Sequence, residues 1–463
     1  MKRRHTLVLP HKIAGQLHQH LFPGDGLEAA ALLLCTSTGR RRPKLLGRDI
    51  IPVPYSDCVR KPDFLTWPGE YVEAAIDRAA LRGDLIIAVH SHPGGLFDFS
   101  LADDESDGIL MGALRHGTDR DAGSAVMIPD GAIRARIYHS DHSAVPVDLV
   151  IEAGPDLRLW WNAQASAVGP LRPPMAFTSE MRAWLGQTSA CVIGVSGTGS
   201  VVAEQLARLG IGEIILIDFD KLEERNLNRI LNSMIGDIGV DKVEMFASAI
   251  RRYRPDCEVV SVTDSIATRE AVLAACEADF LFSCVDTAEG RHIADRMSAS
   301  FSMPLFDVGV AIPTEAGPAG GRRIAEVYGR VDYVYPSGSS LMDRGVYDAA
   351  LLEAEYLART APHAHARKIA DGYLRGMDEE APAVIALNMR AASACIIEFL
   401  ARVFPFRQFS NEARARAIFM LAEGDEDTFA EGHFTNGARF PLACGVSEPL
   451  LGLPALGQRK SVT

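Results

Sequence analysis

The sequence contains no apolar run that approaches the ~20 residues needed to span a bilayer. Its basic first residues lead into a short apolar stretch at 6–10, which is shorter than the ~7–15 residues that form the core of a signal peptide. We therefore expect no membrane partner and no secretory leader.

Paired cysteines are also missing. No two of the eight cysteines form a C-x-x-C pair; they are Cys35, Cys58, Cys191, Cys257, Cys276, Cys284, Cys395 and Cys444. Scattered thiols in a chain of this size are typical of buried residues in a reducing compartment, and they argue against a disulfide framework. The sequence predicts a cytoplasmic protein.

Positive charge is scarce. The chain has 47 Lys and Arg against 60 Asp and Glu, which gives a formal net charge of −13. This balance argues against nucleic acid or an anionic membrane surface as a partner.

The length and the changes of pattern along the chain indicate more than one domain. The 463 residues, 48% of them hydrophobic, suffice for two or three domains of ~150 residues. We interpret 1–150 as one domain, the Gly-Pro- and Pro-Pro-containing segment 151–176 as a linker, and 177–463 as a second domain with a C-terminal extension. Strand–helix alternation from about 190 to 310 predicts βαβ units and a mostly parallel sheet, so the fold class is α/β.

The first chemical pattern follows a strand-length apolar run at 85–89. His90 and His92 come next, and the period-two alternation of a strand puts both imidazoles on one face. Asp103, at the start of a predicted helix, can bring a carboxylate oxygen to the same point. Two imidazoles and one carboxylate leave the fourth tetrahedral position open for water, as a catalytic zinc requires. A further carboxylate must then move the proton, and Glu28 is the candidate.

Each part of this pattern also has an ordinary explanation. An isolated H-x-H pair is usually structural or solvated, and Ser100-x-x-Asp103 alone is a helix-capping box. Glu70 and Glu73 precede the apolar run as Glu28 does. Other acidic residues surround Asp103, namely Asp98, Asp104, Glu105 and Asp107. Only the combination at this spacing indicates a metal site.

The combination resembles the JAMM (JAB/MPN-plus) family of zinc isopeptidases, in which a glutamate is followed by H-x-H, ten further residues and an aspartate. The resemblance covers about 1–150 and implies a cytidine-deaminase-like α/β domain with His90, His92 and Asp103 as zinc ligands. It also implies that Glu28 is the general acid–base and that Ser100 stabilises the oxyanion of the tetrahedral intermediate.

The second chemical pattern is a glycine-rich turn between a strand and a helix, Gly194-Val-Ser-Gly197-Thr-Gly199. The backbone N–H groups of such a turn and the helix N-terminus can meet phosphate oxygens. Against the dinucleotide template G-x-G-x-x-G, the middle glycine, which lets a pyrophosphate approach closely, is replaced by Ser196. Asp218 ends the next strand, where a carboxylate can bind ribose hydroxyls. By itself this turn would serve NAD, FAD or ATP.

Residues further along the chain favour ATP. Asn226, Arg229 and Lys242 can surround a polyphosphate, and Asp286 can bind Mg²⁺. Together they suit attack by a carboxylate on the α-phosphate, because cations neutralise the charge on the departing pyrophosphate. A hydride-transferring site has no comparable use for them. Taken singly, Asp218 is also explained as a strand-end cap, Arg229 and Lys242 as solvated charges, and Asp286 as a turn former.

The order and spacing of three segments resemble the ThiF/MoeB/HesA family, the bacterial relatives of ubiquitin-activating enzymes. The segments are Leu216-Ile-Asp218-Phe-Asp220, Asn226-Leu-Asn-Arg229 and Asp237-Ile-Gly-Val-Asp-Lys242, and the likeness spans about 177–310. It implies a Rossmann-like adenylation domain that uses ATP and Mg²⁺, with Arg229 and Lys242 acting on the reacting phosphates and Asp286 on magnesium. The implied nucleotide-binding residues are Gly194, Gly197, Gly199, Asp218, Asp220, Asn226, Arg229, Lys242 and Asp286.

The chain departs from this family at three points. The C-x-x-C pairs that hold a structural zinc in many relatives are absent, so we expect no such zinc. No cysteine lies between 285 and 394, where a thioester-forming residue is expected; Cys395 is predicted to be core, and nothing supports Cys444. Relatives donate an arginine across a homodimer interface, for which Arg182 is the nearest candidate. The homodimer is itself expected only from the resemblance.

These patterns predict a protein that processes and activates a ubiquitin-like partner ending in glycine. The front domain would cut the partner's precursor or its conjugates, and the rear domain would adenylate the exposed C-terminus before any conjugating enzyme acts. The alternative is a sulfur-carrier or peptide adenylyltransferase of a biosynthetic pathway, with a carrier-releasing front domain. A scaffold without metal and a nicotinamide dehydrogenase are further alternatives, which a zinc assay and an ATP-binding assay would decide.

Overall fold

The computed structural model describes residues 4–39, 41–141, 143–164, 171–317, 321–361, 384–420, 423–435, 437 and 440–458. The chain divides into two compact units, which we describe separately. The front unit is Met1–Pro173 with Ala299–Ser302 and Pro441–Ser447, and the rear unit is Pro174–Ser298, Met303–Phe440 and Glu448–Thr463. Among the described residues, no helix combines the length and the apolar character required to cross a membrane.

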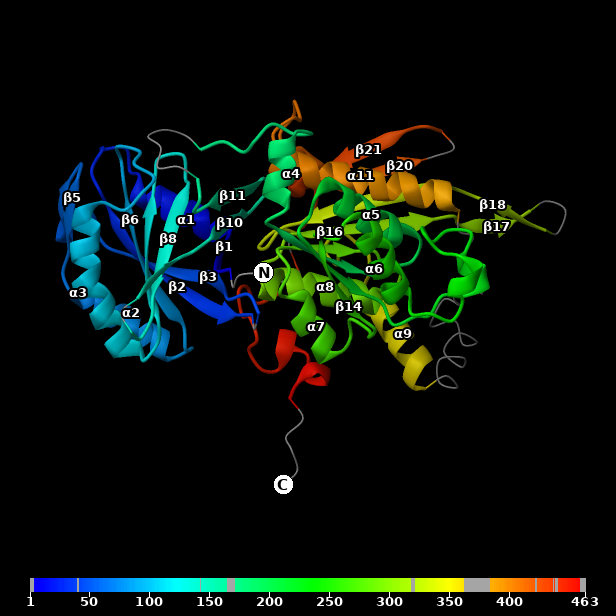
Figure 1. Cartoon of the computed structure of the whole chain (residues 1–463), viewed down its shortest axis with the longest axis horizontal. Coiled ribbons are helices and arrows are strands. Elements are labelled where there is room, and N and C mark those ends of the chain that lie inside the picture. Colours follow the sequence, from blue (N-terminus) through cyan, green and yellow to red (C-terminus); the bar gives the residue numbers. More distant parts are fainter. Residues whose placement is uncertain are drawn as a thin grey trace, which may run out of the picture. The chain divides into compact units, whose positions relative to one another are not determined.

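Within its described residues, the front unit contains a nine-stranded mixed sheet in the order β11-β10-β1-β3-β2-β6-β7-β8-β9 (Figure 1). These strands are β1 (Thr6–Pro10), β2 (Ala30–Thr38), β3 (Lys44–Pro52), β6 (Leu85–Ser91), β7 (Ala122–Met127), β8 (Ile133–Tyr138), β9 (Ala144–Pro146), β10 (Leu149–Ala153) and β11 (Leu157–Trp161). A separate hairpin pairs β4 (Val59–Lys61) with β5 (Phe64–Thr66). The helices are α1 (His11–Leu21), α2 (Glu70–Ala80) and α3 (Leu101–Thr118).

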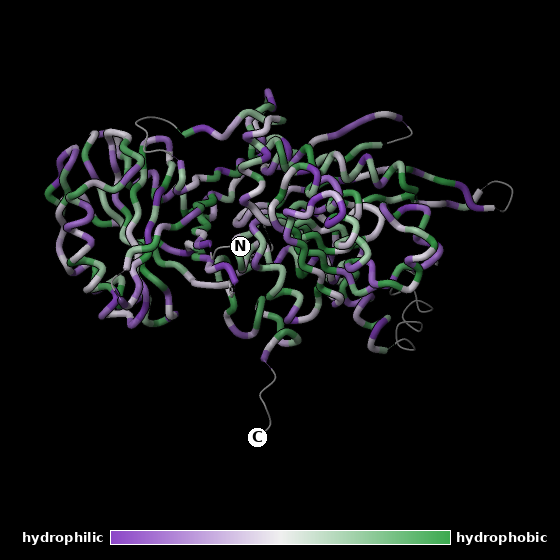
Figure 2. Tube along the Cα trace, in the orientation of Figure 1, coloured by the Kyte–Doolittle hydropathy of each residue, from purple (hydrophilic) through white to green (hydrophobic). Residues whose placement is uncertain are grey.

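The central strands of this sheet send alternate side chains to two separate cores. Leu33 of β2 belongs to the cluster that includes Leu17 of α1, whereas Leu32 belongs to the cluster that includes Ala75 of α2 and Leu114 of α3. Period-two alternation therefore places α1 on one face of the sheet and α2 and α3 on the other. Figure 2 shows β2 and β6 as hydrophobic stretches, as expected for strands that are covered on both faces.

The segment 151–176, interpreted above as a linker, starts as part of the front sheet. β11 pairs antiparallel with β10, so the Gly154-Pro155 sequence that looked like the end of a domain is the turn of a hairpin. Trp160 and Trp161 are 5% and 4% exposed. The front unit extends to Pro173, beyond the boundary at 150 that the sequence suggested.

The described residues of the rear unit form an eight-stranded sheet in the order β14-β13-β12-β15-β16-β19-β20-β21. The strands are β12 (Ser189–Ile193), β13 (Glu213–Ile217), β14 (Glu258–Val262), β15 (Phe280–Ser283), β16 (Leu305–Ala311), β19 (Tyr328–Val334), β20 (Arg416–Met420) and β21 (Glu426–Phe429). A hairpin joins β17 (Thr314–Ala316) to β18 (Arg322–Ile324). The helices are α4 (Ser179–Leu185), α5 (Gly197–Leu209), α6 (Lys242–Tyr253), α7 (Arg269–Ala275), α8 (Ala288–Ser300), α9 (Ala349–Thr360) and α11 (Ile385–Val403).

β12 to β16 are parallel and follow the strand order of a doubly wound nucleotide-binding fold, which confirms the predicted Rossmann-like sheet. The antiparallel extension β19–β21 was not predicted. Phe399 of α11 packs on Phe280 and Phe282 of β15, whereas Arg291 of α8 reaches Asp307 on the opposite face of the sheet. With helices on both faces, the carboxyl ends of the parallel strands are where ligands bind in such folds.

Candidate metal centre and nucleotide site

The two histidines of the front unit lie where β6 ends. β6 pairs antiparallel with β2, and this register places His90 opposite Ala30. His92 follows directly, and its backbone N–H donates to the carbonyl of Met127 in β7 at 2.8 Å. Because the two residues are two positions apart in extended backbone, both imidazoles lie on one face of the sheet.

Asp103, at the start of α3, completes a cluster of three donors. Its Oδ1 is 2.9 Å from His90 Nε2 and its Oδ2 is 3.3 Å from His92 Nε2, while the two Nε2 atoms are 3.1 Å apart. Ligand atoms bound at 2.0–2.1 Å to a tetrahedral ion are about 3.3 Å from one another. The three side chains therefore fit one metal ion that keeps a fourth position open.

A backbone acceptor fixes the orientation of His92. The Nδ1–H of its ring donates to the carbonyl of Leu96 at 2.9 Å, so that Nε2 is the nitrogen that faces Asp103 and His90. The sequence carries no signal for this contact, because any residue at position 96 offers a carbonyl.

The capping box considered above is present together with the cluster. Ser100 N–H donates to Asp103 Oδ2 at 2.6 Å, and Asp103 N–H donates to Ser100 Oγ at 3.2 Å. Burial alone would raise the pKa of Asp103, but the hydrogen bonds from His90 and His92 outweigh it and hold the pKa well below its usual range. Burial would likewise lower the pKa of His92, and the Asp103 carboxylate raises it instead. A hydroxyl that accepts one bond keeps its proton for donation, so Ser100 can still serve a ligand.

Glu28 lies two residues before the start of β2 and is 8% exposed. Its N–H donates to the carbonyl of Lys61 in β4 at 3.0 Å, and its own carbonyl accepts from Arg60 Nε at 2.6 Å. Burial raises the pKa of its carboxyl group, against the opposing influence of His90 and His92. A buried carboxyl beside the cluster can exchange a proton near neutral pH more readily than an exposed one.

The competing acidic residues are exposed or paired elsewhere. Glu70, Glu73 and Glu105 are exposed. The remaining three are in ion pairs: Asp98 with Arg134 at 3.1 Å, and Asp104 and Asp107 with Arg136 at 2.6 and 2.7 Å. Among the residues that the structure describes, His90, His92 and Asp103 form the one group of this kind able to hold a metal ion.

In the rear unit, the glycine-rich turn joins β12 to α5 and needs two of its glycines for steric reasons. Gly194 has a φ of +83°, and a Cβ on Gly199 would lie 1.7 Å from the carbonyl oxygen of Gly194. Ser196 has a φ of −95°, which a side chain tolerates, so the replacement of the middle glycine does not strain the turn. The turn can therefore present its N–H groups to phosphates.

The two cations predicted for the phosphates both lie against this turn. Lys242, at the start of α6, is 4% exposed, and its Nζ donates to Ser196 Oγ at 3.1 Å and to Asp220 Oδ2 at 2.8 Å. The Cδ of Arg229 is 3.6 Å from the position that a Cβ on Gly197 would occupy. A lysine ammonium and an arginine at the N-terminal end of a helix suit a polyphosphate.

The other predicted residues of the nucleotide site are Asp218, Asn226 and Asp286. The Asp218 carboxylate accepts from the N–H groups of Val195 and Asp220 at 2.7 and 2.9 Å, and burial raises its pKa. Asn226 is 4% exposed. Asp286 is exposed beyond the end of β15, the neighbour of β12.

Neither candidate cysteine presents a reactive thiol. Cys395 is fully buried in α11, and burial raises the pKa of its thiol well above the usual value. Burial raises the pKa of Cys444 as well. A thioester-forming cysteine acts as the thiolate, so neither environment favours that role.

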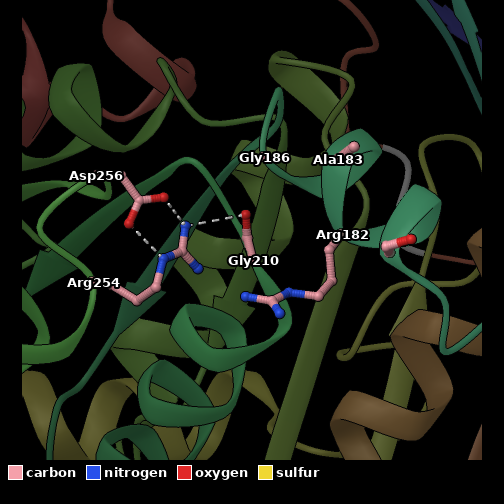
Figure 3. A pocket seen from close by; sticks show the side chains of 7 residues that line it. Arg182, Ala183, Gly186, Gly210, Arg254 and Asp256 are labelled. Carbon is pink, nitrogen blue, oxygen red and sulfur yellow. Dashed lines mark hydrogen bonds and ion pairs between the residues drawn. The ribbon is translucent and has the colours of Figure 1, made fainter.

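Arg182 lies on α4, before β12, and thus at the opposite end of that strand from the glycine turn. It lines a pocket of about 380 Å³ together with Ser179, Ala183, Gly186, Gly210, Arg254 and Asp256. Figure 3 shows the Arg182 guanidinium pointing into this pocket, while Arg254 is paired with Asp256. Arg182 therefore does not reach the glycine turn of its own chain.

Comparison with known protein families gives two matches along the chain. Residues 10–136 match the prokaryotic homologs of the JAB domain, and residues 173–386 match the ThiF family.

Curated proteins match over a short part of the chain. A ubiquitin-like modifier-activating enzyme 5 from Aedes aegypti is 33% identical over 137 residues, which is 27% of this chain and 34% of that protein. A tRNA threonylcarbamoyladenosine dehydratase from Haemophilus influenzae is 43% identical over 90 residues, which is 19% of this chain and 34% of that protein. The chain thus spans about a third of the length of these relatives.

Among solved structures, E. coli MccB with ATP is similar at 17% identity, with a TM-score of 0.42, over 57% of this chain and 69% of that one.

Proposed function

Because the chain joins a domain of the prokaryotic JAB family to a domain of the ThiF family, we propose that it cuts a peptide or isopeptide bond with the first and adenylates a C-terminal carboxylate with the second. The substrate of both steps would be a ubiquitin-like protein that ends in glycine. The first step would expose this end, and the second would activate it.

The front unit supplies the groups that such a cleavage needs. His90, His92 and Asp103 would hold a zinc ion, which when bound lowers the pKa of a water ligand toward ~7. Glu28 would take a proton from the attacking water and return it to the leaving amine. The hydroxyl proton of Ser100 would be donated to the oxyanion of the tetrahedral intermediate.

The rear unit supplies the groups that adenylation needs. The substrate carboxylate attacks the α-phosphate of ATP, so that an acyl–phosphate bond forms and pyrophosphate leaves. Arg229 and Lys242 would neutralise charge on the phosphates, Asp218 would bind ribose, and Asp286 would take part in binding Mg²⁺.

One observation carries the proposal. A three-donor metal cluster and a glycine turn with two cations against it occur on the same chain. Either site alone would fit many proteins, whereas a hydrolytic site and an ATP site on one chain suit a substrate that must be trimmed before it is activated.

The test uses the full chain, MgATP, labelled pyrophosphate and a small protein that ends in Gly-Gly, with and without extra residues after it. We expect exchange of label into ATP only with the trimmed partner, and cleavage only of the extended one. His92→Ala should abolish cleavage and spare exchange with the trimmed partner, whereas Lys242→Ala should do the reverse. ATP binding without partner-dependent exchange would reject the adenylation step.

A second candidate is supported by the environment of the cysteines. Since Cys395 and Cys444 have raised pKa values, the adenylate could pass to a sulfur donor rather than to a cysteine of this chain. The substrate would then be a sulfur carrier or a peptide of a biosynthetic pathway. Mass spectrometry distinguishes the two candidates, because conversion of the partner's carboxylate to a thiocarboxylate adds about 16 Da.

A further inference from the structure

The serine that replaces the middle glycine of the turn makes a contact that a glycine could not make. Its hydroxyl oxygen accepts a hydrogen bond from Lys242 Nζ at 3.1 Å. The same ammonium donates to Asp220 Oδ2 at 2.8 Å. Lys242 is thereby held between the glycine turn and the segment that follows β13.

The surroundings of this contact leave it open to a ligand. Ser196 is partly exposed, whereas Gly197, Thr198 and Gly199 beside it are buried. Within the part of the chain that the structure describes, the Ser196 hydroxyl is bonded to Lys242 alone. A hydroxyl that accepts one bond keeps its proton, and an ammonium that makes two bonds has a third N–H to give. The remaining N–H of Lys242 can therefore serve a phosphate at the turn.

We propose that Ser196 is a positioning residue of the nucleotide site, whose hydroxyl keeps the Lys242 ammonium at the glycine turn when the phosphates of ATP replace Asp220 as its partner. This inference rests on the proposed use of ATP. The role it assigns requires the Ser196 hydroxyl, so a glycine at this position could not fill it. The physical reason is the length of the lysine side chain, which has many rotamers that binding must restrict. A fixed acceptor on the turn restricts the side chain before the ligand arrives.

The serine at position 196 also affects which nucleotide the turn can bind. A glycine at this place lets the pyrophosphate of a dinucleotide approach the backbone closely. A Ser196 side chain takes up space in that approach, and through its contact with Lys242 it holds an ammonium at the turn for a terminal polyphosphate. The turn is thus better suited to ATP than to NAD or FAD.

The test is a set of binding titrations on the full chain with MgATP and, separately, with adenosine, which has no phosphate. Ser196→Ala should weaken ATP binding about tenfold, the loss expected when a hydrogen bond to a charged group is removed. Adenosine binding should not change, and Ser196→Thr, which keeps a hydroxyl, should restore ATP binding. Ser233→Ala is the matched control, because that hydroxyl donates only to a backbone carbonyl, of Ile230 at 2.7 Å.

A double-mutant cycle shows whether Ser196 acts through the lysine. If it does, Ser196→Ala combined with Lys242→Ala should bind ATP no more weakly than Lys242→Ala alone. Additive losses would overturn the inference, as would an equal loss of adenosine binding in Ser196→Ala, which would indicate a damaged turn. Absence of any preference for ATP over adenosine in the unsubstituted protein would instead contradict the proposed function.

Discussion

The metal centre and the nucleotide site differ in how their charged groups are held before a ligand arrives. In the front unit the donors already face one another, and Asp103 is in contact with both histidines. In the rear unit Lys242, the main cation of the proposed nucleotide site, is paired with an internal acid, Asp220, which a bound triphosphate would have to displace. The front site is therefore preorganised, whereas the rear site must exchange one partner for another.

The difference follows from how much of the chain builds each site. The ligands of the front cluster lie within 90–103, at the end of one strand and the start of the next helix. The rear site draws on residues from 194 to 286, which follow three different strands. A site built from neighbours in sequence keeps its geometry as a unit, whereas a site gathered from several strand ends can adjust when a ligand binds.

The largest effect is expected from breaking the preorganised site. Asp103→Ala should release the metal and reduce cleavage by more than about 100-fold, because loss of even an indirect partner of a metal ligand costs about 10- to 100-fold. Metal content by atomic emission and cleavage of an extended Gly-Gly precursor are the measurements. Asp104→Ala is the control, since Asp104 is exposed and paired with Arg136. Full metal content in Asp103→Ala would show that the cluster is not the binding site.

The next largest effect is expected from the rear site. Lys242→Ala should reduce partner-dependent pyrophosphate exchange by about 100- to 1,000-fold, the range seen when one preorganised charge-stabilising donor is removed. Lys221→Ala is a matched control, because Lys221 is an exposed lysine of the same region whose Nζ lies 3.6 Å from Asp241. Equal losses in both variants would mean that local charge, rather than the position of Lys242, supports the reaction.

The proximity of the three side chains in the front cluster could be predicted from the sequence because its geometry is local. The alternation of a strand and the first turn of a helix suffice to bring His90, His92 and Asp103 together. The position of Glu28 relative to the histidines depends instead on the pairing of β2 with β6 across some 60 residues of sequence. No spacing rule gives that register, which places Ala30 opposite His90.

Other features escaped prediction for physical reasons that can be named. Gly154-Pro155 interrupts the apolar pattern, so the sequence suggests a linker where β10 and β11 form a hairpin. Glycine and proline are also the residues that the turn of a β-hairpin favours, and the pattern does not distinguish the two cases. The strands β19 and β20 were missed because one face carries charges, among them Arg330, Asp332 and Arg416, that pair with one another. Buried charge pairs remove the hydrophobic alternation that identifies a strand.

Chelation should separate the two units by their stability. A metal present at 100 times its dissociation constant stabilises the folded state by about 2.7 kcal/mol, which for a unit of this size corresponds to roughly 5–10 °C in melting temperature. We expect EDTA to lower the melting transition of the front unit by this amount and to leave that of the rear unit unchanged. If EDTA also lowered the melting temperature of the rear unit, that unit would contain a structural metal, although the sequence has no C-x-x-C pair.

The smallest effect concerns a group of hydrogen bonds between α8 and the segment 341–347 of the rear unit. His292 accepts from Arg296 Nε at 2.8 Å and is 3.1 Å from the hydroxyl of Tyr347, which donates to Asp295 at 2.7 Å. The carboxylate of Asp295 in turn accepts from the N–H groups of Leu341 and Met342 at 2.9 and 3.2 Å. A network of hydrogen bonds thus connects α8 to the segment 341–347, and it requires the neutral imidazole of His292.

Acid should weaken this hydrogen-bond network. Burial, with the neighbouring Arg296, lowers the pKa of His292 to about 4. Because the unfolded state binds the proton more readily, the contribution of His292 is complete above pH 6.5 and is lost as the pH falls toward 4. At pH 5 the loss is on the order of 1 kcal/mol after allowance for partial exposure.

The measurement is urea unfolding of the rear transition at pH 7 and pH 5, for the unsubstituted protein and for His292→Gln. Asp295, whose pKa burial raises to about 7, responds to pH in the opposite sense in both proteins, so the difference between them isolates His292. We expect His292→Gln to lose less stability than the unsubstituted protein between pH 7 and pH 5. Equal losses would mean that His292 has the same pKa in the folded and unfolded states, and that the contact with Arg296 does not lower it.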